Sequence, residues 1–246
     1  MTGKQKRARL QILIAVLAVI TIVAAAFFIY TSDYYHADGS AAAALVSDSQ
    51  VTVEQSDGDL VFIPASEPAA GLIFYPGGKV EYTAYAPLMR SLAEQGVQCV
   101  LMKMPFNLAV LDINAAEGTA EKFPEIGSWY IGGHSLGGTM AASYALKHSG
   151  ELDGLILLAS YSTADLSESG LKVLSVYGSE DGVLNMNEYA NDLANLPADT
   201  RELVINGGNH AGFGSYGAQS GDGAASIAPE EQVRQTSEKI ISFISE

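Results

Sequence analysis

The chain has 246 residues, with 28 acidic and 13 basic side chains and a formal net charge of −15 at pH 7. All 28 acidic residues and only nine basic ones lie beyond residue 30. A surface this acidic argues against a nucleic-acid partner, which needs clustered Lys and Arg, and against docking of the folded part on anionic lipid. Cys99 is the only cysteine, so no intrachain disulfide can form. No Cys/His cluster has the spacing of a zinc site, and we expect neither a metal nor another cofactor.

An uncharged apolar run follows a basic N-terminus. Residues 10–30 carry no charge, and they are preceded by Lys4, Lys6, Arg7 and Arg9. As a helix the run would extend about 31 Å, at about 1.5 Å per residue, which is enough to cross a hydrocarbon core of about 30 Å. We therefore predict that residues 1–30 form a basic cytoplasmic tail and a transmembrane anchor. A cleaved signal peptide is the alternative, since residues 24–26 are three alanines that could serve as a cleavage site.

The basic residues before the run also predict orientation. The positive-inside rule puts the N-terminus in the cytoplasm and the rest of a single-pass protein of the cell membrane outside it. Residues 31–50 are rich in Ala, Ser and Asp, and we interpret them as a stalk. Residues 51–246 suit one catalytic domain.

Short apolar runs alternate with amphipathic ones beyond residue 50. The predicted strands are 51–54, 60–64, 71–75, 99–104, 129–132, 154–159, 171–177 and 201–205. The predicted helices are 82–95, part of 107–123, 138–148, 187–196 and 229–245. This alternation predicts an α/β fold with a mostly parallel central sheet covered by helices on both faces. A hairpin signal at Asp57 and Gly58 indicates an antiparallel start.

Ser135 stands in a glycine-flanked segment between a predicted strand and a predicted helix. The sequence from Gly133 to Gly137, GHSLG, matches G-x-S-x-G. A turn this sharp strains its central residue and needs small residues two before and two after it. The helix N-terminus beneath the hydroxyl favours developing negative charge. We predict that Ser135 is a nucleophile; the alternative is a helix-capping serine.

A serine hydroxyl is a poor nucleophile unless a base takes its proton, and four histidines are available. His36 falls in the predicted stalk, and His148 ends a helix. His134 lies inside the turn, with its side chain expected to point away from a base position. His210 follows the last predicted strand in a glycine-rich loop, and we predict that it is the base.

A carboxylate must fix the tautomer of that histidine and stabilise its cation. Asp181 and Glu180 follow the strand before last, and we predict Asp181, because the glycine after it lets the backbone turn the short side chain inward. Asp165, in the loop after the preceding strand, is the fallback. Asp222 follows the histidine and so lies on the wrong side of it in chain order.

The order Ser135, Asp181, His210, each directly after a strand, resembles the α/β-hydrolase fold family. The resemblance covers roughly residue 60 to the C-terminus, and its most specific parts are GHSLGG, YGSEDG and NGGNHAGF. The compact size is similar to the dienelactone-hydrolase-like and small carboxylesterase branch. Dienelactone hydrolases use a cysteine nucleophile, whereas position 135 is serine. A second departure is the sequence YPGG at residues 75–78, where many relatives carry His-Gly.

The resemblance implies a site and a reaction. The family places its oxyanion hole after the strand 71–75, where the backbone N–H of Gly78, or that of Lys79, would join that of Leu136. The implied reaction is cleavage of small acyl esters through an acyl-enzyme. Only about ten residues, 161–170, lie where many relatives insert a cap, which favours small or exposed acyl groups. The alternatives are an amidase or acyltransferase, or a membrane-tethered binding or scaffold protein without catalysis.

Overall fold

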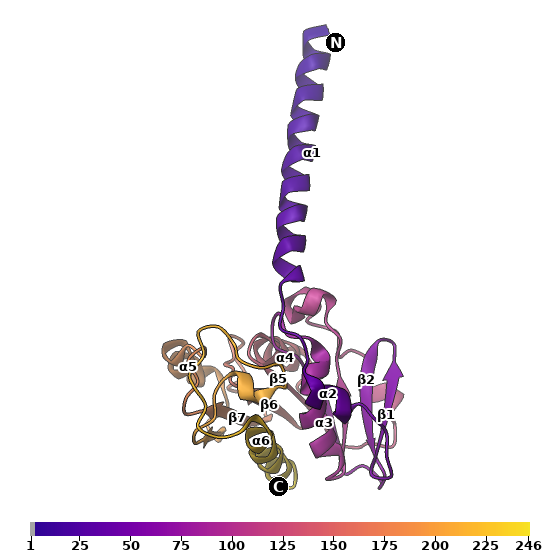
Figure 1. The fold of residues 1–246 in the computed structure, drawn as a ribbon, viewed down its shortest axis with the longest axis vertical. Coiled ribbons are helices and arrows are strands. Elements are labelled where there is room, and N and C mark those ends of the chain that lie inside the picture. Colours follow the sequence, from indigo (N-terminus) through magenta and orange to yellow (C-terminus); the bar gives the residue numbers. More distant parts are fainter. Residues whose placement is uncertain (1–2) are drawn as a thin grey trace. The chain divides into compact units, whose positions relative to one another are not determined.

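The structure is a computed structural model that describes residues 3–246, and it divides into two compact units at the step from Tyr34 to Tyr35 (Figure 1). The first unit consists of the helix α1 (Gly3–Ser32). Its segment Arg9–Ser32 is the one described helix long and apolar enough to cross a membrane; a signal sequence near the N-terminus meets the same criteria.

The second unit is built on an eight-stranded sheet in the order β1-β2-β4-β3-β5-β6-β7-β8. The strands are β1 (Val51–Ser56), β2 (Asp59–Pro64), β3 (Ala70–Tyr75), β4 (Val97–Leu101), β5 (Trp129–His134), β6 (Gly154–Leu158), β7 (Lys172–Gly178) and β8 (Arg201–Ile205). β2 is antiparallel to β1 and β4, and the other pairs are parallel. Asp57 and Gly58 turn the β1–β2 hairpin with positive φ at both residues. The predicted antiparallel start is thus confirmed.

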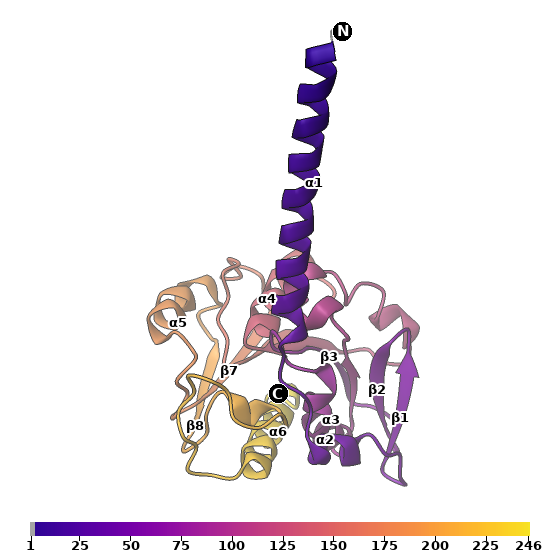
Figure 2. The same ribbon diagram turned by 45° about the horizontal axis from the view of Figure 1, so that its top comes forward.

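Helices cover both faces of this sheet (Figures 1 and 2). The helices α3 (Ala86–Ala93) and α6 (Pro229–Ile244) pack on one face, and α4 (Leu136–Lys147) packs on the other. Along β3, Leu72 and Phe74 join the first core, and Ile73 and Tyr75 join the second. Every residue of β3 and β5 is buried, as strands covered on both faces require. The predicted α/β fold is confirmed.

The structure differs from the predicted stalk over residues 31–50. The compact unit begins at Tyr35, and the short helix α2 (Gly39–Ala44) packs its buried face, Ala41 and Ala44, onto the domain. Asp38 caps this helix by accepting hydrogen bonds from two of its first backbone amides. Small alanine side chains let the helix approach the core closely, which composition alone does not distinguish from a solvated linker.

Several predicted elements are shorter or broken. The predicted helix 82–95 is a 3-10 turn, η1 (Tyr82–Tyr85), followed by α3, and the predicted strand 99–104 leaves the sheet after Leu101. The region 107–123 contains two 3-10 turns and the last residue of a third in place of an α-helix, and the predicted helix 187–196 ends early. The remaining elements are η2 (Pro105–Asn107), η3 (Ala109–Leu111), η4 (Ala120–Lys122), α5 (Met186–Asp192), η5 (Leu193–Asn195) and η6 (Ala211–Phe213).

Candidate active site

Ser135 occupies the turn between β5 and α4 with φ 52° and ψ −125°. A non-glycine residue rarely adopts positive φ, and the surrounding hydrogen bonds hold it there. The Ser135 N–H donates to the carbonyl of Leu158 at 2.9 Å, and the Ser135 carbonyl accepts from Ser160 Oγ at 2.8 Å. The backbone of Ser135 is therefore pinned to the neighbouring strand and the loop after it.

Glycines make this turn sterically possible. A Cβ atom on Gly133 would come within 2.5 Å of the carbonyl carbon of Gly137. A Cβ atom on Gly137 would collide with the backbone carbonyl oxygens of Tyr75 and Pro76. Backbone atoms cannot move aside as a flexible side chain can, so both positions need glycine.

His210 and Asp181 form a buried pair. Nδ1 of His210 lies 2.9 Å from Oδ2 of Asp181, and each side chain is only 1% exposed. The other carboxylate oxygen of Asp181 accepts from the N–H groups of Val183 and Leu184 at 2.9 and 2.8 Å. The carboxylate is thus fixed by three hydrogen bonds, and it holds the proton of a neutral His210 on Nδ1. Nε2 is then the nitrogen left to accept a proton.

Ser135 and His210 line the same cavity, which has a volume of about 320 Å³. Nε2 of His210 is buried and has no hydrogen-bond partner among residues 3–246. The cavity is walled by residues from α4 and from the loops after β6 and β7: Leu136, Thr139, Ala159, Ser160, Tyr161, Thr163, Val183, Leu184 and Asn185. The structure therefore brings together all three residues predicted for the reaction.

The two other candidate acids lie elsewhere. Glu180 accepts a hydrogen bond from the hydroxyl of Ser179, its sequence neighbour. Asp165 accepts from the backbone and hydroxyl of Ser167, which lowers the pKa of the Asp165 carboxyl. Neither carboxylate is bonded to a histidine.

Asp222, set aside on chain order, connects the two loops that carry Asp181 and His210. Its Oδ1 accepts from Gly182 N–H at 3.0 Å and from His210 N–H at 3.2 Å, and its Oδ2 accepts from Ala211 N–H at 2.8 Å. Backbone amides donating to a carboxylate make strong hydrogen bonds. Asp222 thus sets the spacing of the two loops without touching either side chain of the pair.

His134 lies beside His210, and it is not among the residues that line the cavity at Ser135. The rings of His134 and His210 have centroids 4.5 Å apart, and Nδ1 of His134 lies 2.8 Å from the hydroxyl of Tyr85. That hydroxyl accepts from Gly77 N–H at 3.0 Å, so its own proton is available to His134. Burial, with a smaller contribution from the charge that His210 carries when it is protonated, holds the pKa of His134 well below its usual value. His134 is therefore a neutral neighbour of His210.

The loop after β3 contains one amide suited to an oxyanion. Gly77 N–H donates to Tyr85, and Lys79 N–H donates to the carbonyl of Asn107 at 2.8 Å. In the part of the chain that the structure describes, the N–H of Gly78 donates no hydrogen bond. Gly78 also lies close to Leu136, because a Cβ atom on Gly78 would come within 2.9 Å of the Leu136 side chain. Leu136 begins α4, where the first amides have no partner within the helix. The geometry favours Gly78 over Lys79 beside Leu136.

The other features singled out in the sequence lie apart from this cavity. His36 and His148 lie near Glu81 and Glu151, at 3.5 and 3.2 Å. Cys99 is fully buried in β4, and burial raises the pKa of its thiol. Among residues 3–246, no group of three or more His, Cys, Asp or Glu side chains could hold a metal ion.

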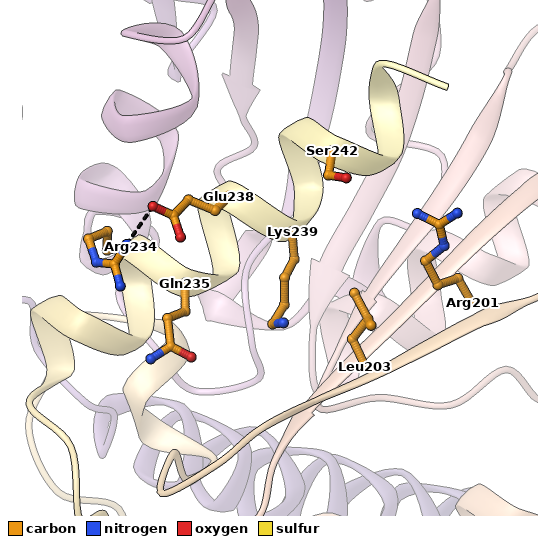
Figure 3. A pocket seen from close by; sticks show the side chains of 7 residues that line it. All are labelled: Arg201, Leu203, Arg234, Gln235, Glu238, Lys239 and Ser242. Atoms are coloured by element: carbon orange, nitrogen blue, oxygen red, sulfur yellow. Dashed lines mark hydrogen bonds and ion pairs between the residues drawn. The ribbon is translucent and has the colours of Figure 1, made fainter.

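A larger cavity, of about 680 Å³, lies between β8 and α6 (Figure 3). Arg201 and Leu203 line it from the strand, and Arg234, Gln235, Glu238, Lys239 and Ser242 line it from the helix. No cysteine lines this cavity, and no histidine lies there to activate Ser242, its one serine. The smaller cavity at Ser135 is therefore the candidate active site.

The sequence profile of the alpha/beta hydrolase family matches residues 71–234. No curated protein sequence matches the chain. Among solved structures, Est1E from Butyrivibrio proteoclasticus is 15% identical with a TM-score of 0.56, and the match covers 80% of this chain and 100% of that one. Carboxyl esterase 2 from the mycorrhizal fungus Tuber melanosporum is 13% identical with a TM-score of 0.58, over 87% and 91%. A CIB-like hydrolase from Thermoplasma acidophilum is 17% identical with a TM-score of 0.54, over 78% and 98%.

Proposed function

Because the chain belongs to the alpha/beta hydrolase family, we propose that this enzyme is a membrane-anchored serine hydrolase that cleaves small acyl esters. One observation carries the proposal. Ser135, on its strained turn, shares a cavity with a histidine whose Nδ1 is bonded to a buried carboxylate. A serine that only caps a helix needs neither a strained backbone nor a neighbouring histidine–carboxylate pair.

The reaction begins with attack by Ser135 Oγ on the acyl carbonyl while Nε2 of His210 takes the hydroxyl proton. Asp181 keeps the other ring proton on Nδ1 and stabilises the imidazolium. Negative charge then develops on the carbonyl oxygen, and the amides of Gly78 and Leu136 stabilise it. His210 returns its proton to the leaving alcohol. Water then attacks the acyl-enzyme by the same steps in reverse, which frees the acid and restores Ser135.

The shape and lining of the cavity support a small substrate. Its volume of about 320 Å³ lies at the lower end for small-molecule sites. The segment between β6 and β7, residues 159–171, contains no helix that could cover the cavity as a cap. Est1E has been solved with ferulic acid bound, a small acid of the kind that an ester hydrolase releases. These features favour short or compact acyl groups over long buried chains.

The anchor is supported by α1 and by the four basic residues at its start. A helix of this length and composition would hold the enzyme at the cell membrane with the catalytic domain outside the cytoplasm. Protease added to intact cells should remove the domain. Protection of the domain until the cells are lysed would contradict this orientation.

The enzymatic proposal is tested with the full chain in detergent and a series of p-nitrophenyl esters from acetate to laurate. We expect turnover of the short esters, with a loss of at least about 10³-fold in Ser135→Ala. Ser167→Ala, at a serine that bonds only Asp165, is the matched control and should keep wild-type activity. Equal rates in Ser135→Ala and wild type, or no turnover of any ester by wild type, would contradict the proposal.

A further inference from the structure

Exposed apolar side chains gather on one loop that is hydrogen-bonded to the loop of Gly78. Residues 35–246 have seven exposed large apolar side chains, and three of them lie within six residues. These are Phe106, Val110 and Leu111, between 47% and 49% exposed. Apolar residues scattered singly over a surface are ordinary, but a cluster on one loop indicates a binding surface.

The loop, residues 105–111, has buried residues that fix it to the domain and exposed apolar residues on its surface. Leu108 and Ala109 are buried, and Ala109 belongs to the second core, while Val110 and Leu111 are exposed. None of the seven residues is charged. The carbonyl of Asn107 accepts the hydrogen bond from Lys79 N–H, so the loop is joined to the strand end that carries Gly78.

The chain enters the domain at the same place. Tyr35 donates its N–H to the carbonyl of Lys79 at 2.8 Å, and its carbonyl accepts from Glu81 N–H at 2.8 Å. In the sequence, only two residues separate Tyr35 from Ser32, where α1 ends. Three peptide steps reach at most about 11 Å, whatever direction they take. Connectivity alone therefore keeps this edge of the domain close to the lipid surface once α1 spans a membrane.

We propose that the loop of residues 105–111 contacts the lipid surface, with Val110 and Leu111 entering the interface. The proposal rests on the membrane anchor proposed above. It selects lipid as the partner because a short tether holds an uncharged apolar loop at the membrane. Residues 31–246 carry 28 acidic and nine basic side chains, so attraction to anionic headgroups cannot drive the contact. Burial of apolar side chains in a zwitterionic lipid interface can drive it instead.

This contact gives the enzyme access to a class of substrate. Esters with one polar and one apolar part concentrate in a membrane interface. The Gly78 loop packs close to Leu136, the residue after Ser135, and is bonded to the docked segment. An amphiphilic ester could then present its carbonyl to Ser135 without first dissolving in water.

The test places a fluorescent bimane label on the full chain, using Val110→Cys, Leu111→Cys and the control Leu146→Cys. Leu146 is 45% exposed, similar to the two loop residues, but lies ten residues along α4 from Leu136, about 15 Å from the site end of that helix. The native Cys99 is buried and should not react. Each labelled protein is reconstituted into phosphatidylcholine vesicles whose acyl chains are either plain or brominated, because bromine quenches bimane only on close approach.

We expect brominated lipid to reduce bimane emission at positions 110 and 111 at least twofold and to leave position 146 unchanged. Equal emission in both lipids at all three positions would overturn the proposal. A disulfide between two copies of Val110→Cys, without quenching, would also overturn the proposal, because it would show that the loop contacts a second copy of the chain and not lipid. Vesicle flotation is read separately: chain that fails to float overturns the anchor, whereas floating chain without quenching overturns only the loop contact.

Discussion

Replacing Asp181 by asparagine should remove most of the activity while leaving the fold intact. One oxygen of Asp181 accepts from Val183 and Leu184 N–H, and these two donors need an acceptor in the variant as well. The asparagine carbonyl oxygen will therefore take that place, and its NH₂ group will face Nδ1 of His210. Because an NH₂ group can only donate, His210 must carry its proton on Nε2 and can no longer take one from Ser135.

The size of the effect follows from this change of tautomer. The equivalent substitution in a serine protease lowers kcat about 10⁴-fold, which is about 5.5 kcal/mol of activation free energy. We expect kcat to fall about 10³- to 10⁴-fold here, which is the order of magnitude of that case. Asp181 does not line the cavity, so KM should change less than about threefold.

The assay is steady-state hydrolysis of the best short p-nitrophenyl ester, with thermal unfolding to verify the fold. Asp165→Asn and Glu180→Gln are the matched controls, because each removes a charge from another candidate acid. Both should keep activity within about twofold of wild type. The reasoning is refuted if Asp181→Asn keeps more than a tenth of the wild-type kcat, or if either control loses as much.

Three further variants test the surroundings of the pair. Gly137→Ala should lower the free energy of unfolding in urea by about 3 kcal/mol or more, because its Cβ meets the backbone of Pro76; a loss below about 0.5 kcal/mol would contradict this steric argument. Asp222→Asn should lower kcat about tenfold at constant KM, since an amide cannot accept from all the backbone N–H groups that join the two loops; a change in KM alone would point to a substrate contact. His134 stays neutral when folded but protonates when unfolded, so wild-type stability should fall as pH drops below about 6.5, by up to about 1.4 kcal/mol per pH unit. Urea titrations at pH 5 and 7 should show a weaker fall in His134→Phe, and an unchanged fall would contradict the assignment.

Periodicity and turn chemistry predict the central fold because those signals are local. Buried strands such as β3 and β5 are continuous apolar runs, and Asp57 and Gly58 supply the positive φ values of a tight hairpin. The break between η1 and α3 also has a local signal: Pro87 has no N–H to continue the hydrogen bonding of the preceding turn, and it fits the first turn of a new helix. One continuous helix over residues 82–95, as predicted from the apolar pattern, is therefore wrong at this proline.

The remaining features depend on contacts between distant segments. Ala41 and Ala44 are buried only because α2 packs against α3, and an alanine-rich linker has the same composition. Asp222 bonds two loops that meet only in three dimensions, so chain order gives no indication of its position. The place of His134 beside His210 likewise follows from how the last loop folds over the sheet.

The most direct test of the central claim is to locate the residue that a fluorophosphonate modifies. The full chain is treated with the reagent, digested, and mapped by mass spectrometry, with Ser135→Ala treated in parallel. We predict one phosphonylated peptide, modified at Ser135, and no labelling of the variant. Labelling at another serine, or labelling of Ser135→Ala at the wild-type rate, would contradict the account.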